Sequence, residues 1–371
     1  MSALPKFVEF GVAKARGDVA EARGDVAVVL LGTGVVGGAF LRLLSSVRAG
    51  IRIVGVANSS RQIADADGFV LEAASTQLAH AAPGRSDEAL LGALHESGAA
   101  RRVVVDATAS PATAARHAEW LARGYAVVTA NKIALSTSSH AWNELRSECA
   151  RGGTYGDAAT VGAGLPVLAT LRRLHACGDA LVTLDGVFSG SLSWLFNQYD
   201  GTRPFSSLLR EARAWGYTEP DPRFDLSGAD VARKLVILAR AAGHAIDVDD
   251  VAVESLVPAS LRDVDVETFL ARAGELDTAI AERHAAAVAR GCRLRHLATF
   301  DPNGRAEVGL VAVDADHPAA RLSGADNLFA LTTQRYRARP LVIQGPGAGA
   351  EVTAQALLGD LLALQPARLA I

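Results

Sequence analysis

An aspartate and a lysine four residues apart, Asp230 and Lys234, are the pair in this sequence best suited to proton chemistry. At that spacing both side chains project from the same face of a helix. An ammonium group there can protonate a carbonyl oxygen and stabilise the negative charge that forms on it. Taken alone, such a pair is more often a solvated ion pair, so the surrounding residues have to decide. Ser227 precedes Asp230 by three residues, in capping-box spacing, and we expect it to begin the helix.

A glycine fingerprint near the start of the chain has the spacing that binds a dinucleotide. Gly32, Gly34 and Gly37 form a Gly-x-Gly-x-x-Gly pattern between an apolar run at 26–31 and a helical pattern that begins near Ala39. The first glycine permits a tight turn, the second admits a pyrophosphate, and the third lets the helix pack closely. The alternative is an ordinary glycine-rich turn between a strand and a helix. We predict cofactor contacts along this turn at Gly32, Thr33, Gly34, Val35, Val36 and Gly37.

The residues after the second predicted strand indicate which nicotinamide cofactor is bound. Proteins that bind NAD usually place an acid there, which accepts from the ribose 2′-hydroxyl. This chain has Asn58, Ser59, Ser60 and Arg61 instead, with no acid among them. A guanidinium and hydroxyl groups suit a 2′-phosphate, so we expect a preference for NADP, with NAD as the alternative cofactor. A solvated Arg61 without a ligand is the competing interpretation.

The runs between these residues predict a doubly wound α/β domain. Continuous apolar runs are typical of strands buried on both faces of a parallel sheet. We predict such strands at 26–31, 51–57, 103–107 and 125–129. Ser110 and Pro111 begin one predicted helix, Gly124 ends it, and a second helix spans 139–150. The order strand, glycine turn, helix, strand is a βαβ unit, so we expect a Rossmann-type doubly wound parallel sheet.

Beyond Gly153 the alternation becomes less regular, which predicts a second domain of the α+β class. We expect strands at 181–189, 294–300, 307–313 and 341–344. Helical patterns cover 205–215, 228–242, 266–290 and 352–364. The last helix follows a glycine loop, and we expect this return segment to pack on the first domain. The predicted division is an N-terminal extension at 1–25, a dinucleotide-binding domain at 26–152, a substrate-binding and dimerisation domain at 153–340, and the return segment at 341–371.

Composition and charge argue against several classes of protein. Half of the residues are hydrophobic, so two domains of this size can each bury a core. A formal net charge of -3 argues against a nucleic-acid partner. No apolar run reaches the ~20 residues of a membrane-spanning helix, and early charged residues argue against a signal peptide. The three cysteines, Cys149, Cys177 and Cys292, have no CxxC spacing, so we expect no disulfide framework, no zinc site and a cytoplasmic location.

Five longer segments are similar to one known family along nearly the whole chain from Val26 onward. They are Val128-Thr-Ala-Asn-Lys132, Val161-Gly-Ala-Gly-Leu-Pro166, Gly186-Val-Phe-Ser-Gly-Ser-Leu-Ser193, Gly216 to Lys234, and Gly345-Pro-Gly-Ala-Gly-Ala-Glu-Val-Thr353. The fourth segment is highly specific, because a motif of that length does not recur by chance. Together the segments resemble homoserine dehydrogenase in a short form without an ACT domain or an aspartate kinase fusion. The resemblance implies interconversion of L-aspartate 4-semialdehyde and L-homoserine with NAD(P)(H), on the route to threonine and methionine.

The resemblance also implies roles for single residues. Lys234 is the implied acid/base group, and Lys132 lies between cofactor and substrate and shares the proton transfer. Glu219 and Asp230 match homoserine contacts, with Glu219 suited to the substrate ammonium, and Asp225 matches an acid near the reacting hydroxyl. Further substrate contacts are expected at Tyr217, Gly190 and Ser191. Further cofactor contacts are expected at Asn58, Ser59, Arg61, Thr108, Lys132 and Gly349.

Two positions depart from the family pattern. The family usually has an acid three residues before Val161 that helps to bind a monovalent cation, whereas this chain has Ala158 there, with Asp157 one place earlier. The remaining candidate ligands for sodium or potassium are backbone carbonyls, those of Val161, Ala163 and Leu165. Phe224 stands where a second acid usually precedes Asp225, but Asp225 itself is present.

Two other functions stay open at this stage. An aspartate-semialdehyde dehydrogenase would need a thiolate nucleophile, and no cysteine here lies in a convincing nucleophile motif. A non-catalytic NADP-binding sensor would keep the glycine turn without needing Lys132 and Lys234 together. By resemblance we expect a small-molecule substrate and a homodimer or dimer of dimers formed through the middle domain, with no membrane partner. Without an ACT module, we expect no direct inhibition by threonine.

Overall fold

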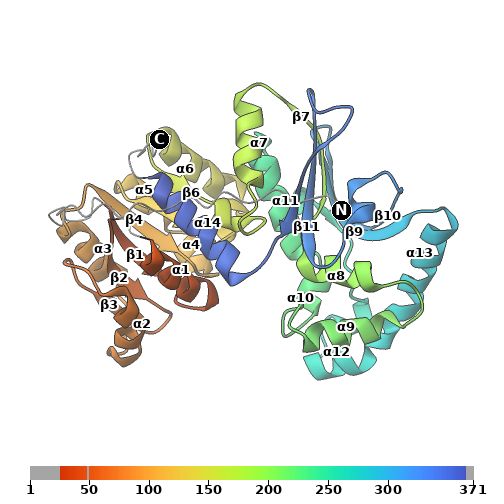
Figure 1. Ribbon diagram of the computed structural model, residues 1–371, viewed down its shortest axis with the longest axis horizontal. Helices are drawn as coiled ribbons and strands as arrows, with labels where there is room; N and C mark the ends of the chain where they lie inside the picture. Colours follow the sequence, from red (N-terminus) through yellow and green to blue (C-terminus); the bar gives the residue numbers. More distant parts are fainter. Residues whose placement is uncertain (1–25, 48–49, 365–371) are drawn as a thin grey trace, which may run out of the picture.

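The structure, a computed structural model, describes residues 26–47 and 50–364, so the extension expected at 1–25 lies outside the described residues. The first domain contains a six-stranded sheet in the order β3-β2-β1-β4-β5-β6. Its strands are β1 (Val26–Leu31), β2 (Ile51–Ala57), β3 (Gln62–Ala64), β4 (Arg101–Asp106), β5 (Ala126–Thr129) and β6 (Tyr155–Gly156). Neighbouring strands are parallel except β3, which is antiparallel to β2. The predicted doubly wound sheet is confirmed (Figure 1).

Helices cover both faces of this sheet. They are α1 (Val35–Ser46), α2 (Leu71–His80), α3 (Asp87–Glu96), α4 (Pro111–Ala114), α5 (His117–Ala122) and α6 (Ser139–Ala150), with 3₁₀ turns η1 (Ile133–Leu135) and η2 (Ala158–Thr160). Alternate residues of β1 belong to two different hydrophobic clusters, one shared with α1 and α2 and the other with α3 and α5. Successive side chains of a strand point to opposite faces, so β1 is buried throughout and its sequence is continuously apolar.

The second domain also contains a six-stranded sheet, in the order β12-β11-β7-β9-β10-β8. Its strands are β7 (Leu181–Val187), β8 (Ala252–Val253), β9 (Arg293–Asp301), β10 (Arg305–Val313), β11 (Asp326–Thr333) and β12 (Leu341–Pro346). All pairs are antiparallel except that of β8 with β10. Its helices are α7 (Val167–Ala176), α8 (Gly190–Gln198), α9 (Phe205–Ala214), α10 (Arg223–Leu226), α11 (Ala229–Ala241), α12 (Val266–Arg272) and α13 (Asp277–Ala289), with 3₁₀ turns η3 (Val248–Asp250), η4 (Ala259–Leu261), η5 (Ala273–Leu276) and η6 (Pro318–Arg321). This mixture is the expected α+β architecture.

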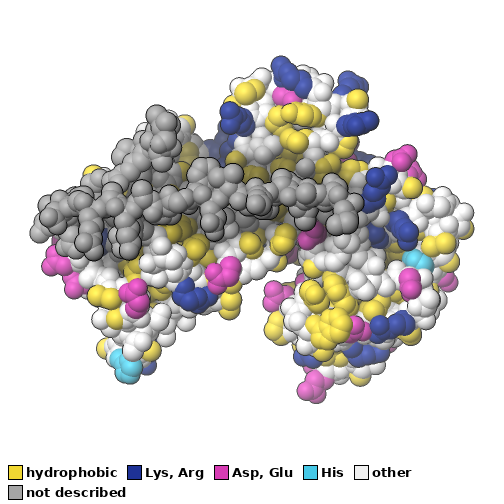
Figure 2. Space-filling model, in the orientation of Figure 1, with side chains coloured by type: hydrophobic (Ala, Val, Ile, Leu, Met, Phe, Trp, Pro, Cys, Tyr) yellow, Lys and Arg dark blue, Asp and Glu magenta, His cyan; other side chains and the backbone are white. Residues whose placement is uncertain are grey.

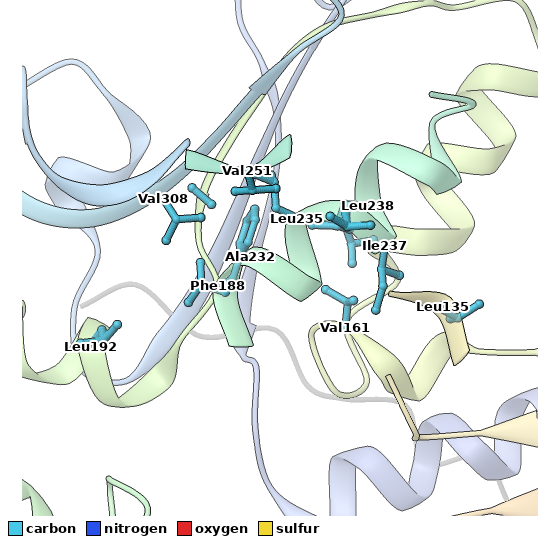
Figure 3. Close-up of a cluster of buried hydrophobic side chains, with 14 of the residues drawn as sticks. Leu135, Val161, Phe188, Leu192, Ala232, Leu235, Ile237, Leu238, Val251 and Val308 are labelled. Carbon is cyan, nitrogen blue, oxygen red and sulfur yellow. The ribbon is translucent and has the colours of Figure 1, made fainter. Parts of the chain in front are cut away.

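Helix α11 is the central element of the hydrophobic core between the two sheets. Ten of its 13 residues are buried. In Figure 3, Ala232 lies beside Phe188 at the end of β7, whereas Ile237 lies near Val161, in the loop that follows the first sheet. Because α11 packs against both halves of the chain, its N-terminal turn, with Asp230 and Lys234, is held in a fixed place between them.

The chain returns to the first domain through its last helix, α14 (Ala350–Ala363), which lies along α1 (Figure 1). Leu357 and Leu361 of α14 join the same buried cluster as Phe40 of α1. At the surface, Arg42 Nη2 and Glu351 Oε1 are 2.9 Å apart, but both side chains are exposed, so this pair adds little stability. The glycine loop between β12 and α14 therefore crosses from the second sheet to the first domain.

The structure corrects two predicted elements and adds others that were not predicted, β11 among them. The helix predicted at 266–290 is two helices, α12 and α13, because Gly274 interrupts the helical pattern and Asp277 instead binds the backbone N–H and hydroxyl of Ser206. The helix predicted from Pro111 to Gly124 is also divided, into α4 and α5. Strand β11 was not predicted at all, because polar residues at both of its ends leave only a short apolar run.

Three further observations concern the surface and the cysteines. No helix within residues 26–47 and 50–364 is long and apolar enough to cross a membrane. Cys149, Cys177 and Cys292 are all free thiols, as expected. On the face shown in Figure 2, basic and acidic side chains are interspersed over both domains, which agrees with the small net charge.

Candidate active site

Two lysines converge on one carboxylate between the domains. Lys234 Nζ lies 2.8 Å from Asp230 Oδ2, and Lys132 Nζ lies 3.5 Å from Asp230 Oδ1. Lys132 follows β5 at the C-terminal edge of the parallel sheet, where doubly wound proteins bind their ligands. The whole chain has only four lysines, which are Lys6, Lys14, Lys132 and Lys234. Both lysines within the described residues therefore belong to this cluster.

The two ammonium groups determine the charge of Asp230. Loss of water around the Asp230 carboxylate would by itself raise its pKa. The charges of Lys234 and Lys132 outweigh that effect and hold the pKa of Asp230 well below its usual range. Asp230 is consequently ionised at any physiological pH. The cluster of one carboxylate and two ammonium groups keeps an excess of positive charge, which suits an oxygen that becomes negative during a reaction.

Lys234 is the more enclosed of the two lysines. Its side chain is 11% exposed, against 34% for Lys132. Besides the contact with Asp230, Lys234 Nζ donates to the carbonyl oxygen of Phe188 at 2.7 Å. An ammonium group has three hydrogens, so these two contacts leave one for a ligand.

Asp225 organises the predicted substrate loop through hydrogen bonds. Its Oδ1 accepts from the Ser191 hydroxyl at 2.6 Å, and its Oδ2 accepts from the backbone N–H of Glu219 at 2.9 Å. Burial raises the pKa of Asp225, and these two donors oppose the rise. Asp225 thus ties the start of α8 to the loop that carries Glu219. This positioning contact was not foreseen from the sequence.

The remaining predicted substrate residues lie around the same loop. The carboxylate of Glu219 is exposed, and no hydrogen bond or ion pair within the described part of the chain engages it. Tyr217 stacks on Trp194, with ring centroids 5.1 Å apart, and stays 42% exposed. Gly190 is the first residue of α8, directly before Ser191. The loop therefore offers an unpaired carboxylate and aromatic surface, and Asp225 ties it to the start of α8.

The glycine turn has the geometry of a pyrophosphate cradle. A Cβ atom on Gly37 would lie 1.9 Å from the carbonyl oxygen of Gly32, so the helix approaches the turn as closely as backbone allows. A Cβ atom added to Gly34, in contrast, would meet no atom of the described residues within 4 Å. No side chain from residues 26–47 or 50–364 caps α1, and the first residue of α1, Val35, is 79% exposed. Uncapped N–H groups at a helix N-terminus bind an anion, so the residues present fit the phosphates of a dinucleotide.

The turn after β2 is built by Asn58. Its Oδ1 accepts from the backbone N–H groups of Ser60 and Arg61 at 2.9 and 2.8 Å. The Nη1 group of Arg61 donates to the carbonyl oxygens of Ala79 and Ala81 at the end of α2. Among the described hydrogen bonds, none uses Nε or Nη2 of Arg61. Arg61 is therefore anchored beside the exposed Ser59 by one end of its guanidinium group.

A buried acid beside the cofactor residues was missed from the sequence. Asp106, the last residue of β4, accepts from the N–H and the hydroxyl of Thr108, from Asn131 Nδ2 at 3.0 Å, and lies 3.0 Å from His117 Nε2. One carboxylate thus fixes both the predicted contact Thr108 and the loop that leads to Lys132. Its position at the C-terminal end of a parallel strand was the available signal.

The candidate cation loop has carbonyl donors but no carboxylate. Ala163 is the only non-glycine residue within the described ranges with a positive φ, +54°, which marks a tight turn there. The carbonyl oxygen of Leu165 accepts from Val167 N–H at 2.8 Å. The buried Asp157 pairs with the exposed Arg172 through both carboxylate oxygens, so it does not replace the acid missing at Ala158.

The predicted capping box on α11 is wrong. Gly228, in a left-handed conformation with φ +74°, is the N-cap residue. Ser227 lies outside the helix and donates its hydroxyl to the carbonyl oxygen of Phe224. The carboxylate of Asp230 binds the lysines instead of a backbone N–H, because two ammonium groups attract it more strongly than a neutral donor does.

A doubly wound sheet with an open glycine turn, next to a lysine–aspartate cluster, is typical of NAD(P)-dependent oxidoreductases. Family models agree with this class: "Homoserine dehydrogenase, NAD binding domain" matches residues 32–155, and "Homoserine dehydrogenase" matches residues 166–362. This chain belongs to the homoserine dehydrogenase family, and the resemblance of its motifs is confirmed.

Individual relatives support the assignment. A homoserine dehydrogenase of Emericella nidulans is 36% identical over 357 residues, which are 90% of this chain and 96% of that protein. The bifunctional aspartokinase/homoserine dehydrogenase 2 of Escherichia coli is 41% identical over 343 residues, and this chain spans 42% of its length. A crystal structure of a Candida auris protein of unknown function is 35% identical, with a TM-score of 0.85, and the match covers 91% of this chain and 97% of that one.

Proposed function

We propose that this chain interconverts L-aspartate 4-semialdehyde and L-homoserine with a nicotinamide cofactor, as a step towards threonine and methionine. The observation that carries the proposal is the Lys132–Asp230–Lys234 cluster at the edge of the dinucleotide-binding sheet. The unengaged carboxylate of Glu219, in the loop that Asp225 holds, suits the substrate ammonium. When bound, the cofactor supplies or accepts a hydride, and the protein has to move one proton and hold the charges of the substrate.

Lys234 is the group best placed to move that proton. In the direction of aldehyde reduction its ammonium protonates the carbonyl oxygen, and in the direction of alcohol oxidation its amine takes the hydroxyl proton. Asp230 keeps the Lys234 side chain in place at 2.8 Å and orients the substrate. Lys132, on the cofactor side of Asp230, adds positive charge beside the developing alkoxide and shares the proton transfer.

A spectrophotometric assay tests this function. The purified protein is mixed with L-homoserine and NADP⁺, and absorbance of the reduced nicotinamide is followed. We expect turnover with L-homoserine and none with D-homoserine. Binding of NADP⁺ without turnover would contradict the proposal and favour the non-catalytic sensor.

Glu219→Gln should act mainly on substrate affinity. The substrate ammonium is present in both the ground state and the transition state, so losing its partner raises KM and leaves kcat nearly unchanged. A hydrogen bond to a charged group contributes about 1.5–3 kcal/mol, which predicts a rise in the KM for homoserine of roughly 10- to 100-fold. Steady-state kinetics measure this, with Glu267→Gln, an exposed acid on α12, as the control. A normal KM in Glu219→Gln would remove Glu219 from the substrate site.

We also propose that NADP is preferred over NAD, because the turn after β2 has Ser59 and an anchored Arg61 but no acid. Ser59→Asp should reduce kcat/KM for NADP by roughly tenfold or more, since like charges brought together cost at least a kcal/mol. The same variant should use NAD better than the parent, and Ser59→Ala should change the preference little. A parent enzyme that strongly favours NAD would show that Arg61 has no role in selection.

Further parts of the proposal concern a cation and the assembly. Backbone carbonyls at Val161, Ala163 and Leu165 suit sodium or potassium, and the missing carboxylate predicts a weaker site than the family usually has. A homodimer or dimer of dimers is proposed through the second domain, and the free cysteines support a cytoplasmic location. The second sheet exposes three valines, which support that interface: Val253, Val311 and Val342.

A further inference from the structure

The carbonyl oxygen of Phe188 is shared by two donors. Lys234 Nζ donates to it at 2.7 Å, and Asn327 Nδ2 donates to it at 3.1 Å. A carbonyl oxygen has two lone pairs, so both hydrogen bonds form at once. Because the two donors bind the same oxygen, the amide of Asn327 and the ammonium of Lys234 lie close together.

Asn327 is locked in this position by its surroundings. It is fully buried on β11, opposite Gly345 of β12. A Cβ atom on Gly347 would lie 2.0 Å from Asn327 Nδ2, so the backbone of the return loop packs directly against the amide. The amide is therefore wedged between the end of β7 and the loop that leads to α14, and this packing leaves it a single orientation.

The chemistry of Asn327 is not explained by packing alone. Its Oδ1 atom is buried and has no hydrogen-bond partner within the described residues. Leaving a buried acceptor unpaired is unfavourable, so an apolar side chain would fill this space better if filling were its only role. What the amide does provide is the Nδ2 donor to Phe188.

We infer that Asn327 is a positioning residue for Lys234: it holds the Phe188 carbonyl in the orientation that aims the lysine ammonium at the substrate. This inference rests on the proposed function, in which Lys234 moves the proton. It also explains why Gly347 is a glycine, since any larger residue would displace the amide. Two strands far apart in the sequence, β7 and β11, thereby set the direction of one catalytic side chain.

The neutral charge of Asn327 is part of its role. Asp230 is the charged group in direct contact with the Lys234 ammonium. Lys132 pairs with the same Asp230, and Asp225 lies near enough to Asp230 that the charge of Asp230 raises its pKa. Asn327→Asp would place a carboxylate of nearly the same shape next to the carbonyl oxygen that Lys234 binds. A second negative charge at that range favours the ammonium form, so the titration midpoint of Lys234 should rise by about one pH unit.

Nuclear magnetic resonance of isotope-labelled lysine tests this without any activity measurement. The spectrum is tractable because the chain has only four lysines, and Lys234→Arg assigns the signal of Lys234. We expect its titration to move upward by about one pH unit in Asn327→Asp and the signal of Lys132 to move much less. In Asn327→Ala, which loses the donor but adds no charge, the Lys234 signal should shift without that upward titration.

Kinetics of the same variants give the functional result. At neutral pH, Asn327→Asp should oxidise homoserine about tenfold more slowly, because a smaller fraction of Lys234 is in the amine form. The rate should return towards that of the parent at higher pH. Asn327→Ala should lower kcat by roughly 10- to 100-fold, as a misplaced catalytic group does, with the KM for homoserine nearly unchanged.

Asn197 is the matched control for this experiment. Like Asn327, it donates Nδ2 to a backbone carbonyl, that of Gly324 at 2.9 Å, and has an unpartnered Oδ1, but it has no contact with Lys234. Asn197→Asp should leave the Lys234 titration unchanged. A folded Asn327→Asp variant in which Lys234 titrates as in the parent would overturn the inference. If the parent does not oxidise homoserine but the Lys234 signal still responds to Asn327→Asp, the proposed function fails and the positioning role stands.

Discussion

Lys234→Ala should lower kcat by about 10²- to 10⁴-fold, the usual cost of losing a general acid or base, with affinity for NADP nearly unchanged. Lys234 is the enclosed member of the cluster, with one ammonium hydrogen left for a ligand beyond Asp230 and Phe188. The predicted cofactor turn lies on the other domain and does not contact it. Asp230 keeps Lys132 as a partner, so the substitution does not leave an unpaired carboxylate.

Two variants separate the role of Lys234 from a general effect of charge. Arg233→Ala removes an exposed cation from the neighbouring position of α11 and should retain nearly full activity. Lys132→Ala should reduce kcat less than Lys234→Ala does. The measurements are steady-state kcat in both directions and an NADP titration, with circular dichroism to confirm folding. A near-normal kcat in a folded Lys234→Ala enzyme would mean that Lys132, and not Lys234, carries out the proton transfer.

The first domain could be predicted from the sequence because its signals are local. A strand such as β1, buried on both faces, needs an unbroken apolar run. A helix that approaches a turn as closely as α1 does needs a residue without a side chain at the contact, which here is Gly37. The pairing of Asp230 with Lys234 also follows from helical spacing. These features depend on residues within one or two turns of each other, so no knowledge of the tertiary fold was needed.

Several unpredicted contacts of the site join segments that are far apart in the sequence. Asn327 reaches Phe188 only because β11 lies beside β7, and β11 itself was missed. The hydrogen bond from Ser191 to Asp225, which links α8 to α10, was not predicted either. Local spacing identifies which residues are chemically capable, whereas the sheet topology decides which of them meet.

Alanine substitutions of Gly34, Gly37 and Gly38 at the start of α1 should have three different effects. Gly38 lies within the helix, and a Cβ there would be 3.6 Å from Arg42 Nη1. Gly38→Ala should therefore stabilise the fold by roughly 0.5–1 kcal/mol, the difference in helix propensity. Gly37→Ala would place its Cβ 1.9 Å from the Gly32 carbonyl, so it should destabilise the fold by about 3 kcal/mol or more. Thermal unfolding measures both changes.

Gly34→Ala should leave the stability of the fold unchanged and weaken the binding of the cofactor. Gly34 has φ −67° and an extended backbone, which alanine also adopts, and an added Cβ meets no atom within 4 Å among the residues that the structure describes. The space is open on the side where the uncapped N–H groups of α1 would bind the pyrophosphate. One extra methyl group in such a contact costs about 1–3 kcal/mol, so the Kd for NADPH should rise roughly 10- to 200-fold while the melting temperature stays within the range of the parent. Fluorescence titration with NADPH checks this, with Gly38→Ala as the control on the same helix. Parent-like affinity in Gly34→Ala would mean that the pyrophosphate does not lie on this turn, and a large loss of stability would mean that Gly34 is required by the protein rather than by its ligand.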